Sequence, residues 1–383
     1  MVHVFVVGSK GIPARYGGFE TFVEHLTAGK LSAEICYHVS CMDGDEKHFE
    51  YNGADCFNVK LPLPGAPGRI LHVSRTLYQV EQWCRANPGQ NVVVYILGCR
   101  IGPLLYLHAP RLHKLGVKIC CNPDGLEWKR GKWNRLAKTF LKFCEKSLVC
   151  CSDLVICDSK AIEAYIQDTY GASVNETTFI AYGADSTPSA CGDDVYRTWC
   201  GKKGVTPGNY YLSIGRFVPE NNIETVIREF MSSKTQRDLV IVSNVEQNKF
   251  YNDLLRRTDF LSDPRIKFVG TEYNGELVKK IRENAHAYIH GHEVGGTNPS
   301  LLEALASTKV NLLLDVPFNK EVAESAALYW NKSCGSLCDL IHLSDNMNEV
   351  IMQSFGNAGK DRIKQDYNWT GICEQYERLW LRK

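Results

Sequence analysis

The feature that most constrains the fold is a series of short, continuous apolar runs separated by stretches long enough for a helix, and this series occurs twice. A polar stretch containing Gly and Pro, from 183 to 207, divides the two occurrences. Runs of this kind are typical of parallel strands buried on both faces. The sequence therefore predicts two doubly wound α/β domains joined near 183–195. The runs cover 2–7, 92–97, 117–121 and 154–157, and then 210–214, 239–242, 266–269, 287–289 and 310–314.

The composition limits which classes of partner the protein can bind and in which cellular compartment we expect it. At 383 residues the chain is long enough for two domains, and its net charge of +1 offers no overall field that would attract nucleic acid. The sixteen cysteines lie largely inside apolar runs without Cys-x-x-Cys spacing, so we expect buried thiols of a reduced cytoplasmic protein and no metal site. We expect no signal peptide and no membrane span, because no apolar run approaches about 20 residues.

Polar and glycine-rich segments follow several of the predicted strands, where ligands of doubly wound sheets bind. The pair Gly295-Gly296 would let the main chain approach an anion, and the following helix start offers free N–H groups. Glu303, one turn inside that helix, would accept hydrogen bonds from two neighbouring ribose hydroxyls. Together these features predict a pocket for a nucleotide sugar. The alternative is an ordinary loop capped by Asn298 or Ser300.

Two further loops carry candidate residues. Arg216 follows the run 210–214, where its planar guanidinium would bind phosphate oxygens. The alternative is that Arg216 forms only a salt bridge at the rim of the site. The loop after the first strand holds glycines at 8, 11, 17 and 18, which is not the G-x-G-x-x-G spacing of a dinucleotide fold, so a nicotinamide enzyme is disfavoured. We expect that loop to be a lid over a cleft between domains, or else a mobile surface loop.

The stretches 14–20, 124–130, 215–222 and 294–300 give the chain a resemblance to glycosyltransferase family 4, and more narrowly to the bacterial rhamnosyltransferases of capsule and cell-wall polysaccharide. This resemblance implies a retaining enzyme with the GT-B fold, in which two Rossmann-like domains face each other and the last helix crosses back to the first. It also implies an acceptor-binding domain over 1–187, completed by a helix over 367–383. The donor-binding domain would span 188–366.

The resemblance also implies roles for single residues toward the donor, expected to be dTDP-L-rhamnose and to need no metal. Arg216 would hold the diphosphate, the main chain at 295–298 would support the distal phosphate and the sugar, and Glu303 would bind the ribose. Asn221 stands where family members commonly carry a lysine. A UDP- or GDP-hexose is the rival donor. The expected donor-binding residues are Gly17, Gly18, Arg216, Asn221, Gly295, Gly296, Thr297, Asn298 and Glu303.

On the acceptor side, Asp124 follows the predicted strand 117–121. It would orient the acceptor hydroxyl or act as its base, although Pro123-Asp124-Gly125 is also a good turn. With Arg216 it is an expected catalytic residue. An aromatic side chain beside carboxylates, as at Glu127 and Trp128, is a sugar-binding combination. The expected acceptor-binding residues are Arg15, Tyr16, Asp124, Glu127, Trp128 and Arg130.

The stretch 129–146 carries seven Lys and Arg against one acid, Glu145, with apolar residues at helical spacing. A basic amphipathic helix of this kind suits peripheral contact with an anionic membrane and a lipid-diphosphate-linked saccharide as acceptor. The alternative is a solvated helix that packs its apolar stripe on the sheet. A rival of another class is a non-catalytic, sugar-nucleotide-binding partner of a synthesis complex.

Overall fold

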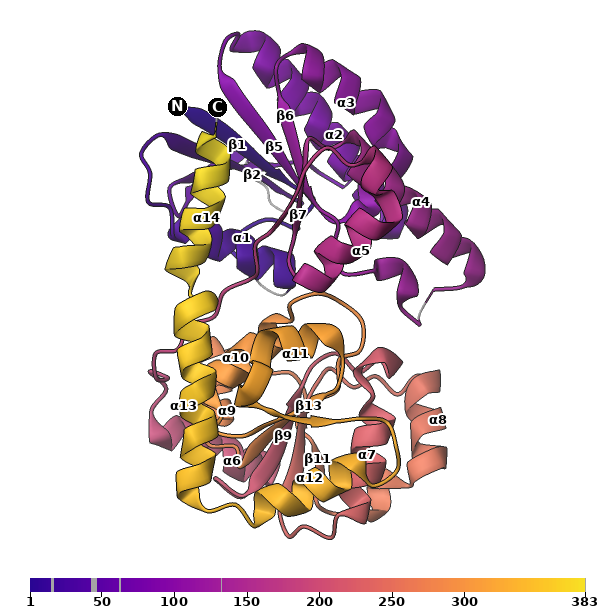
Figure 1. Ribbon diagram of the computed structural model, residues 1–383, viewed down its shortest axis with the longest axis vertical. Helices are drawn as coiled ribbons and strands as arrows, with labels where there is room; N and C mark the ends of the chain where they lie inside the picture. Colours follow the sequence, from indigo (N-terminus) through magenta and orange to yellow (C-terminus); the bar gives the residue numbers. More distant parts are fainter. Residues whose placement is uncertain (15–16, 43–46, 62, 132, 383) are drawn as a thin grey trace. The chain divides into compact units, whose positions relative to one another are not determined.

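A computed structural model describes residues 1–14, 17–42, 47–61, 63–131 and 133–382 of the chain. The chain divides into two compact units, each with its own sheet (Figure 1). Unit 1 is Met1–Gly183 together with Trp369–Lys383, and unit 2 is Ala184–Asn368. The candidate residues Arg15 and Tyr16 lie outside the described residues.

Unit 1 is built on an eight-stranded sheet in its described part, with strand order β3-β4-β2-β1-β5-β6-β7-β8. All neighbours pair in parallel except the edge strand β3, which runs antiparallel to β4. The strands are β1 (Val2–Val7), β2 (Ile35–Cys41), β3 (His48–Tyr51), β4 (Ala54–Asn58), β5 (Asn91–Leu97), β6 (Lys118–Asn122), β7 (Leu154–Cys157) and β8 (Thr177–Phe179). Strands β1, β5 and β7 are almost entirely buried, as their apolar sequences require.

Helices cover both faces of this sheet, and the C-terminal helix is one of them (Figure 1). Its Tyr376 hydroxyl lies 3.0 Å from the Tyr95 hydroxyl of β5, and its Glu377 carboxylate accepts the N–H groups of Leu31 and Ser32. The last helix thus belongs to unit 1, which confirms the expected crossing back. The helices of unit 1 are α1 (Gly18–Ala28), α2 (Gly65–Ala86), α3 (Leu105–Lys114), α4 (Arg135–Cys151), α5 (Lys160–Tyr170) and α14 (Trp369–Leu381).

Unit 2 contains a parallel sheet whose order, in its described residues, is β11-β10-β9-β12-β13-β14. Its strands are β9 (Tyr210–Ile214), β10 (Asp238–Val242), β11 (Ile266–Phe268), β12 (Ala287–His290), β13 (Asn311–Leu314) and β14 (Leu328–Trp330). Its helices are α6 (Asp193–Lys203), α7 (Ile223–Ser232), α8 (Lys249–Thr258), α9 (Gly275–Glu283), α10 (Pro299–Ser307), α11 (Pro317–Ala323), α12 (Ser336–Asp345) and α13 (Glu349–Asp366). The order reverses between β9 and β12, which makes their carboxyl ends the switch point of the sheet.

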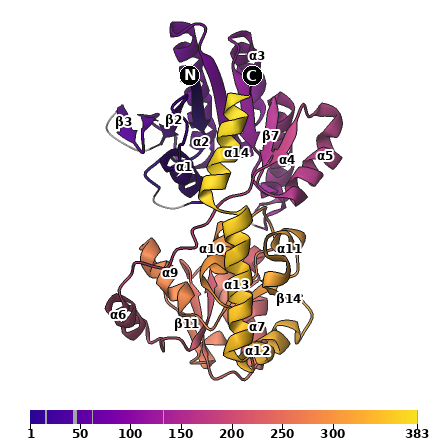
Figure 2. The same cartoon turned by 60° about the vertical axis from the view of Figure 1, so that its left-hand side comes forward.

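Helix α10 packs against the long helix α13, which lies in the foreground of Figure 2. A Cβ atom at Gly359 of α13 would lie only 2.8 Å from the carbonyl oxygen of Leu305, so the two helices meet at a contact that only glycine permits. This contact holds the C-terminal half of α10 against α13.

The predicted α/β class with two doubly wound sheets is confirmed. The sequence missed the strands β2, β3, β4, β8 and β14, and the polar stretch 183–207 contains helix α6. All sixteen cysteines lie in the described part of the chain and carry free thiols, most of them buried. None of the helices in the described ranges combines the length and the apolar character that spanning a bilayer requires.

Candidate functional site

The loops that follow β9 and β12 open at the same edge of the unit 2 sheet, because the two strands are parallel neighbours. The first loop carries Arg216 and the second contains Gly295. Asn222 joins them, since its side-chain amide donates to the carbonyl of Gly291 at 2.8 Å. A Cβ atom at Gly291 would lie 2.3 Å from the carbonyl oxygen of Asn221, so this glycine allows the loops to pack.

Arg216 presents a free cation at this edge. Its side chain is exposed and forms no salt bridge or hydrogen bond with another described residue. Its main chain is fixed, because the carbonyl oxygen accepts hydrogen bonds from the Asn221 side chain at 2.7 Å and from the Val218 amide at 2.9 Å. Asn221 is only 5% exposed and is directed at this carbonyl. The structure thus gives Asn221 the role of positioning the Arg216 loop.

The loop after β12 provides unpaired main-chain donors. Gly295 adopts φ 146°, a conformation that L side chains rarely adopt. Neither its N–H nor that of the buried Gly296 meets an acceptor among the described residues. Thr297, which follows, is 3% exposed. Unpaired amides in a glycine turn are suited to binding an anion.

Asn298 is the N-cap of α10, as the alternative interpretation of this segment allowed. Its side-chain oxygen accepts the N–H of Ser300 at 2.9 Å, and its carbonyl oxygen accepts the N–H groups of Leu301 and Leu302. The amides of the first turn are therefore partly occupied. Anion binding at this helix start depends mainly on the amides of Gly295 and Gly296.

Glu303 lies one turn inside α10 and is held by a partner that the sequence analysis did not find. Its Oε2 atom pairs with the Nη2 atom of Arg282 at 2.5 Å. The Arg282 side chain is only 5% exposed, whereas that of Glu303 is 44% exposed. Oε1 of Glu303 has no partner among the described residues. The salt bridge therefore fixes the carboxylate and leaves one oxygen available to a ligand.

Two histidines at the end of β12 also went unnoticed in the sequence. The rings of His290 and His292 stack with centroids 4.4 Å apart, and a Cβ atom at Gly215 would lie 3.0 Å from the His292 ring. Burial, with the neighbouring His292, lowers the pKa of His290 well below its usual range, so this ring is neutral. The sequence pattern that could have identified these two histidines is His-x-His directly after an apolar run. His292 thus lies beside the Arg216 loop.

In unit 1, the loop after β1 ends at the glycine pair that begins α1. Gly17 has φ 132°, and a Cβ atom there would lie 1.9 Å from the Glu20 carboxylate. Glu20 in turn accepts the amide N–H of Lys10 at 2.8 Å. Gly17 is thus needed for the loop to close on Glu20, and Gly18 is exposed. A contact of either glycine with donor phosphates stays a prediction.

Asp124 follows β6 in a tight turn with φ 64°. Its N–H donates to the Asn122 side chain at 2.9 Å, and its Oδ1 atom accepts the N–H of Gly125 at 2.8 Å. The side chain is 29% exposed, and its Oδ1 atom lies 4.0 Å from Arg130 Nη2. Pro123-Asp124-Gly125 thus forms a turn, as the alternative interpretation of the sequence allowed. This turn holds the partly exposed carboxylate of Asp124 in a fixed orientation.

Glu127 and Arg130 form a salt bridge instead of facing solvent. Arg130 Nε lies 2.6 Å from Glu127 Oε2, with side-chain exposures of 12% and 6%. The Trp133 indole N–H donates to the other Glu127 oxygen at 3.1 Å. The two residues thus brace the segment that leads into α4.

Trp128 lines a pocket of about 360 Å³ on the surface of unit 1. Lys142 lies over its ring with Nζ 4.4 Å from the centroid, and Lys129 lies on the same ring at 5.5 Å. The full lining is Trp128, Lys138, Thr139, Lys142, Phe143, Lys146 and Tyr170. An aromatic floor with three lysines is suited to an anionic ligand that carries an apolar or sugar portion.

The comparisons with known proteins concern the fold. Residues 1–185 match a protein-family model described as a domain of unknown function, DUF1972. A search of curated proteins finds no match to the chain.

Solved structures match nearly the whole chain. A sucrose-phosphate synthase from Thermosynechococcus elongatus is 14% identical, with a TM-score of 0.77 over 99% of this chain and 98% of that chain. HepE from Anabaena, in complex with UDP and glucose, is 14% identical, with a TM-score of 0.74 over 98% of each chain. A glycosyltransferase from Rickettsia africae is 11% identical, with a TM-score of 0.74 over 99% and 97%. The chain thus has the GT-B fold of two Rossmann-like units.

Proposed function

We propose that this protein is a glycosyltransferase that uses a nucleotide sugar as its donor. The observation that carries the proposal is the free guanidinium of Arg216 together with the free amides of Gly295 and Gly296, at the switch point of the unit 2 sheet. A guanidinium and free N–H donors are the groups that bind a diphosphate. HepE, a structural neighbour, binds UDP and glucose.

The same donors would serve the reaction. Transfer breaks the bond between the anomeric carbon and the donor diphosphate, and charge builds up on the departing phosphate oxygen. Arg216 and the Gly295–Gly296 amides stabilise that charge in place, so the reaction needs no metal ion. The new bond forms from an acceptor hydroxyl on the same face of the sugar, as in family 4. The proton of that hydroxyl passes to the leaving phosphate.

We take dTDP-L-rhamnose as the preferred donor, on the resemblance to rhamnosyltransferases. The salt bridge from Arg282 leaves Oε1 of Glu303 free to accept hydrogen bonds from one or two sugar hydroxyls, so it does not itself select the nucleotide. Thymidine diphosphate offers only the 3′ hydroxyl, whereas UDP and GDP offer two. A UDP-hexose donor predicts instead that both hydroxyls contribute to affinity.

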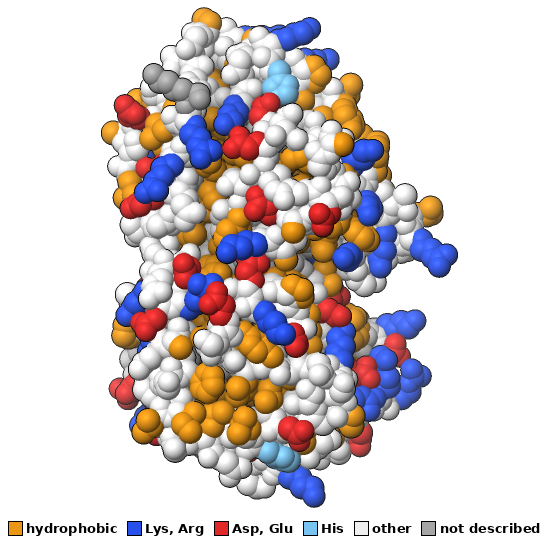
Figure 3. Space-filling view, in the orientation of Figure 1, with side chains coloured by type: hydrophobic (Ala, Val, Ile, Leu, Met, Phe, Trp, Pro, Cys, Tyr) orange, Lys and Arg blue, Asp and Glu red, His pale blue; other side chains and the backbone are white. Residues whose placement is uncertain are grey.

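The acceptor is proposed to be a saccharide linked through a diphosphate to a membrane lipid. In support, the pocket under Trp128 carries three lysines. Next to it, α4 exposes an apolar stripe at positions i, i+4 and i+7, with Leu136 82%, Phe140 47% and Phe143 48% exposed. Figure 3 shows Lys and Arg side chains together with hydrophobic ones over α4, at the right-hand edge of the view.

Helix α4 packs one apolar face, which includes Leu141 and Leu148, into unit 1, and its stripe of Leu136, Phe140 and Phe143 is a second apolar surface that faces solvent. Phenylalanine and leucine flanked by lysines are the composition of a helix that lies in the interface of an anionic membrane. We therefore place α4 on the cytoplasmic face of such a membrane. Asp124, fixed by its turn, is proposed to orient the acceptor hydroxyl.

A donor panel tests the function. The purified protein is incubated with dTDP-L-rhamnose, UDP-glucose, UDP-galactose and GDP-mannose, and nucleotide release is followed with and without EDTA. We expect one favoured donor, the same initial rate with EDTA, and a loss of at least about a hundredfold in Arg216→Ala. Arg256→Ala, which removes another exposed arginine of unit 2, is the matched control and keeps full activity. Binding of a nucleotide sugar without any release would instead identify a non-catalytic partner.

A further inference from the structure

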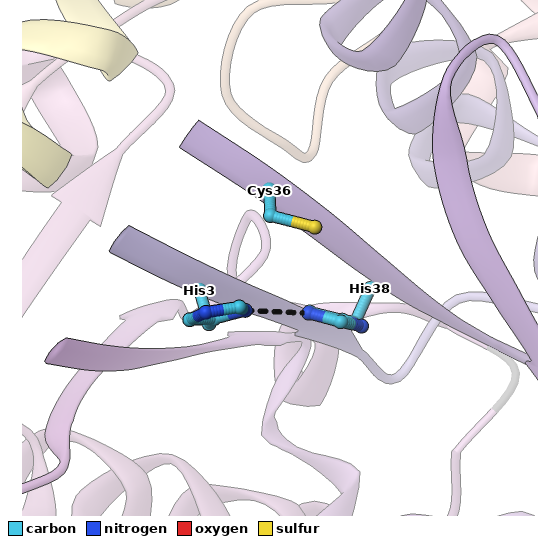
Figure 4. A group of neighbouring side chains, drawn as sticks. All are labelled: His3, Cys36 and His38. Atoms are coloured by element: carbon cyan, nitrogen blue, oxygen red, sulfur yellow. Dashed lines mark hydrogen bonds between the residues drawn. The ribbon is translucent and has the colours of Figure 1, made fainter. Parts of the chain in front are cut away.

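Three side chains on two neighbouring strands of unit 1 place metal-binding atoms together (Figure 4). His3 comes from β1, and Cys36 and His38 come from β2, the parallel neighbour in which Cys36 pairs with His3. Cys36 and His38 are two residues apart, so both project from the same face of the sheet. Their ligand atoms all lie within 4.8 Å of one another, and His3 Nδ1 is 3.0 Å from His38 Nε2.

We propose that His3, Cys36 and His38 bind a transition-metal ion, with Zn²⁺ as the preferred ion and water as the fourth ligand. Imidazole nitrogens and a thiolate are the ligand types that Zn²⁺ selects. In a tetrahedral site with Zn–N bonds of about 2.0–2.1 Å, two nitrogens lie about 3.3 Å apart. His3 Nδ1 and His38 Nε2, which are 3.0 Å apart, therefore have to separate by only roughly 0.3 Å.

The carboxylate behind His38 supports this assignment. Asp55 of β4 accepts a hydrogen bond from His38 Nδ1 at 2.9 Å, so the lone pair of that ring lies on Nε2, the atom directed at His3. A carboxylate that orients a histidine in this way is the usual outer partner of a zinc ligand. The other Asp55 oxygen lies 3.2 Å from His48 Nδ1, which holds the carboxylate in place.

Aromatic rings pack around the cluster of His3, Cys36 and His38 and hold its geometry. Phe5 stacks on His38 with ring centroids 4.4 Å apart, and Trp83 of α2 lies 4.7 Å from the His3 ring. The His38 side chain is 8% exposed, whereas His3 and Cys36 are partly exposed, which leaves a path by which an ion enters.

The position of the cluster indicates a structural role. His3 is the second residue of β1, at the end of the strand opposite to the loop that contains Gly17. In doubly wound sheets substrates bind beyond the carboxyl ends of the strands, so an ion at the amino end of β1 takes no part in sugar transfer. It would instead clamp β1 to β2 and stabilise unit 1. This inference therefore stands independently of the proposed glycosyltransferase activity.

Cobalt substitution of the full chain tests the proposal. The protein is treated with chelator, and Co²⁺ is then added while the visible and near-ultraviolet absorption is recorded. We expect one equivalent of Co²⁺ to give the visible bands of tetrahedral coordination and a thiolate charge-transfer band. Zn²⁺ should displace the cobalt and raise the thermal midpoint of unfolding. Absence of these bands in the wild-type protein would overturn the proposal, whatever its activity with nucleotide sugars.

Variants identify the ligands. Cys36→Ser should abolish the charge-transfer band, and His3→Gln should abolish binding, with folding verified by circular dichroism. Asp55→Asn leaves all three ligands present and should weaken cobalt binding by about 10–100-fold. Cys334→Ser removes an exposed thiol of unit 2 and should change nothing. A charge-transfer band that survives in Cys36→Ser, or disappears in Cys334→Ser, would contradict the assignment.

Discussion

The side-chain amide of Asn221 donates a hydrogen bond of 2.7 Å to the main-chain carbonyl of Arg216. Asn221, at the position where the resemblance to family 4 implies a second cation, is therefore buried, and it organises the loop that carries Arg216. We predict that Asn221→Ala weakens thymidine diphosphate binding by about 3–10-fold, the equivalent of one neutral hydrogen bond. Isothermal titration calorimetry measures this effect.

A substitution at position 221 tests whether a lysine there would strengthen or weaken nucleotide binding. Asn221→Lys places a charge at a site that is 5% exposed and removes the support of Arg216, so we expect weaker binding and a lower thermal midpoint. Tighter binding in this variant would show that the wild-type loop has room for a second cation. Asn346→Ala removes an exposed asparagine of unit 2 that only bonds its own helix, and serves as the control.

Glu303→Gln should reduce affinity for the donor nucleotide by about tenfold or more, because it removes an ionised acceptor and leaves the buried guanidinium of Arg282 without its counter-charge. Calorimetry with thymidine diphosphate and with UDP gives the measurement. If one hydroxyl is bound, 2′-deoxy-UDP binds the wild type as well as UDP does. Glu349→Gln, which removes an exposed glutamate paired with Lys309, should have no effect.

The exposed stripe of α4 should govern membrane binding. We predict that the triple substitution of Leu136, Phe140 and Phe143 by Ser abolishes flotation with vesicles that contain phosphatidylglycerol, while folding is retained because these side chains face solvent. Wild-type binding should fall as salt rises, since the lysine contribution is screened. Leu107→Ser, at an exposed leucine of α3, is the control. Equal flotation of the triple variant would exclude this surface.

The buried Glu145 makes stability depend on pH. Burial raises its pKa, although Tyr165 and Tyr170 both donate hydrogen bonds to its Oε1 atom. The folded state therefore binds this proton more tightly than the unfolded state, and the free energy of unfolding falls as pH rises from the unfolded pKa through the raised value. We predict that the thermal midpoint of Glu145→Gln minus that of the wild type increases as pH rises from 4 to 8. A difference independent of pH would contradict this.

The sequence predicted the parts of the fold that rest on continuous apolar runs. The run 154–157 is β7, and the run 210–214 is β9 with Arg216 at its end. Strand β2 was missed because His38 and Ser40 interrupt its apolar pattern, although both are buried. The residues that obscured this strand include a ligand of the proposed metal site. His3 and Cys36 lie 33 positions apart and meet only through the register of β1 and β2.

Partners separated in sequence were the part of the site that could not be predicted. Glu303 was identified from its place in a helix, but the partner that fixes it, Arg282, lies on a preceding helix. Glu127 and Arg130 were expected to face an acceptor, yet their spacing of three positions equally allows the salt bridge that the structure shows. Short-range patterns identify residue types and strand ends, whereas the partners depend on how elements pack.

A crystal structure of the protein with thymidine diphosphate tests the proposed donor site most directly. We expect the diphosphate within hydrogen-bond distance of the Arg216 guanidinium and of the amides of Gly295 and Gly296, with a sugar hydroxyl on Glu303. A nucleotide bound away from these groups, or no bound nucleotide at saturating concentration, would contradict it.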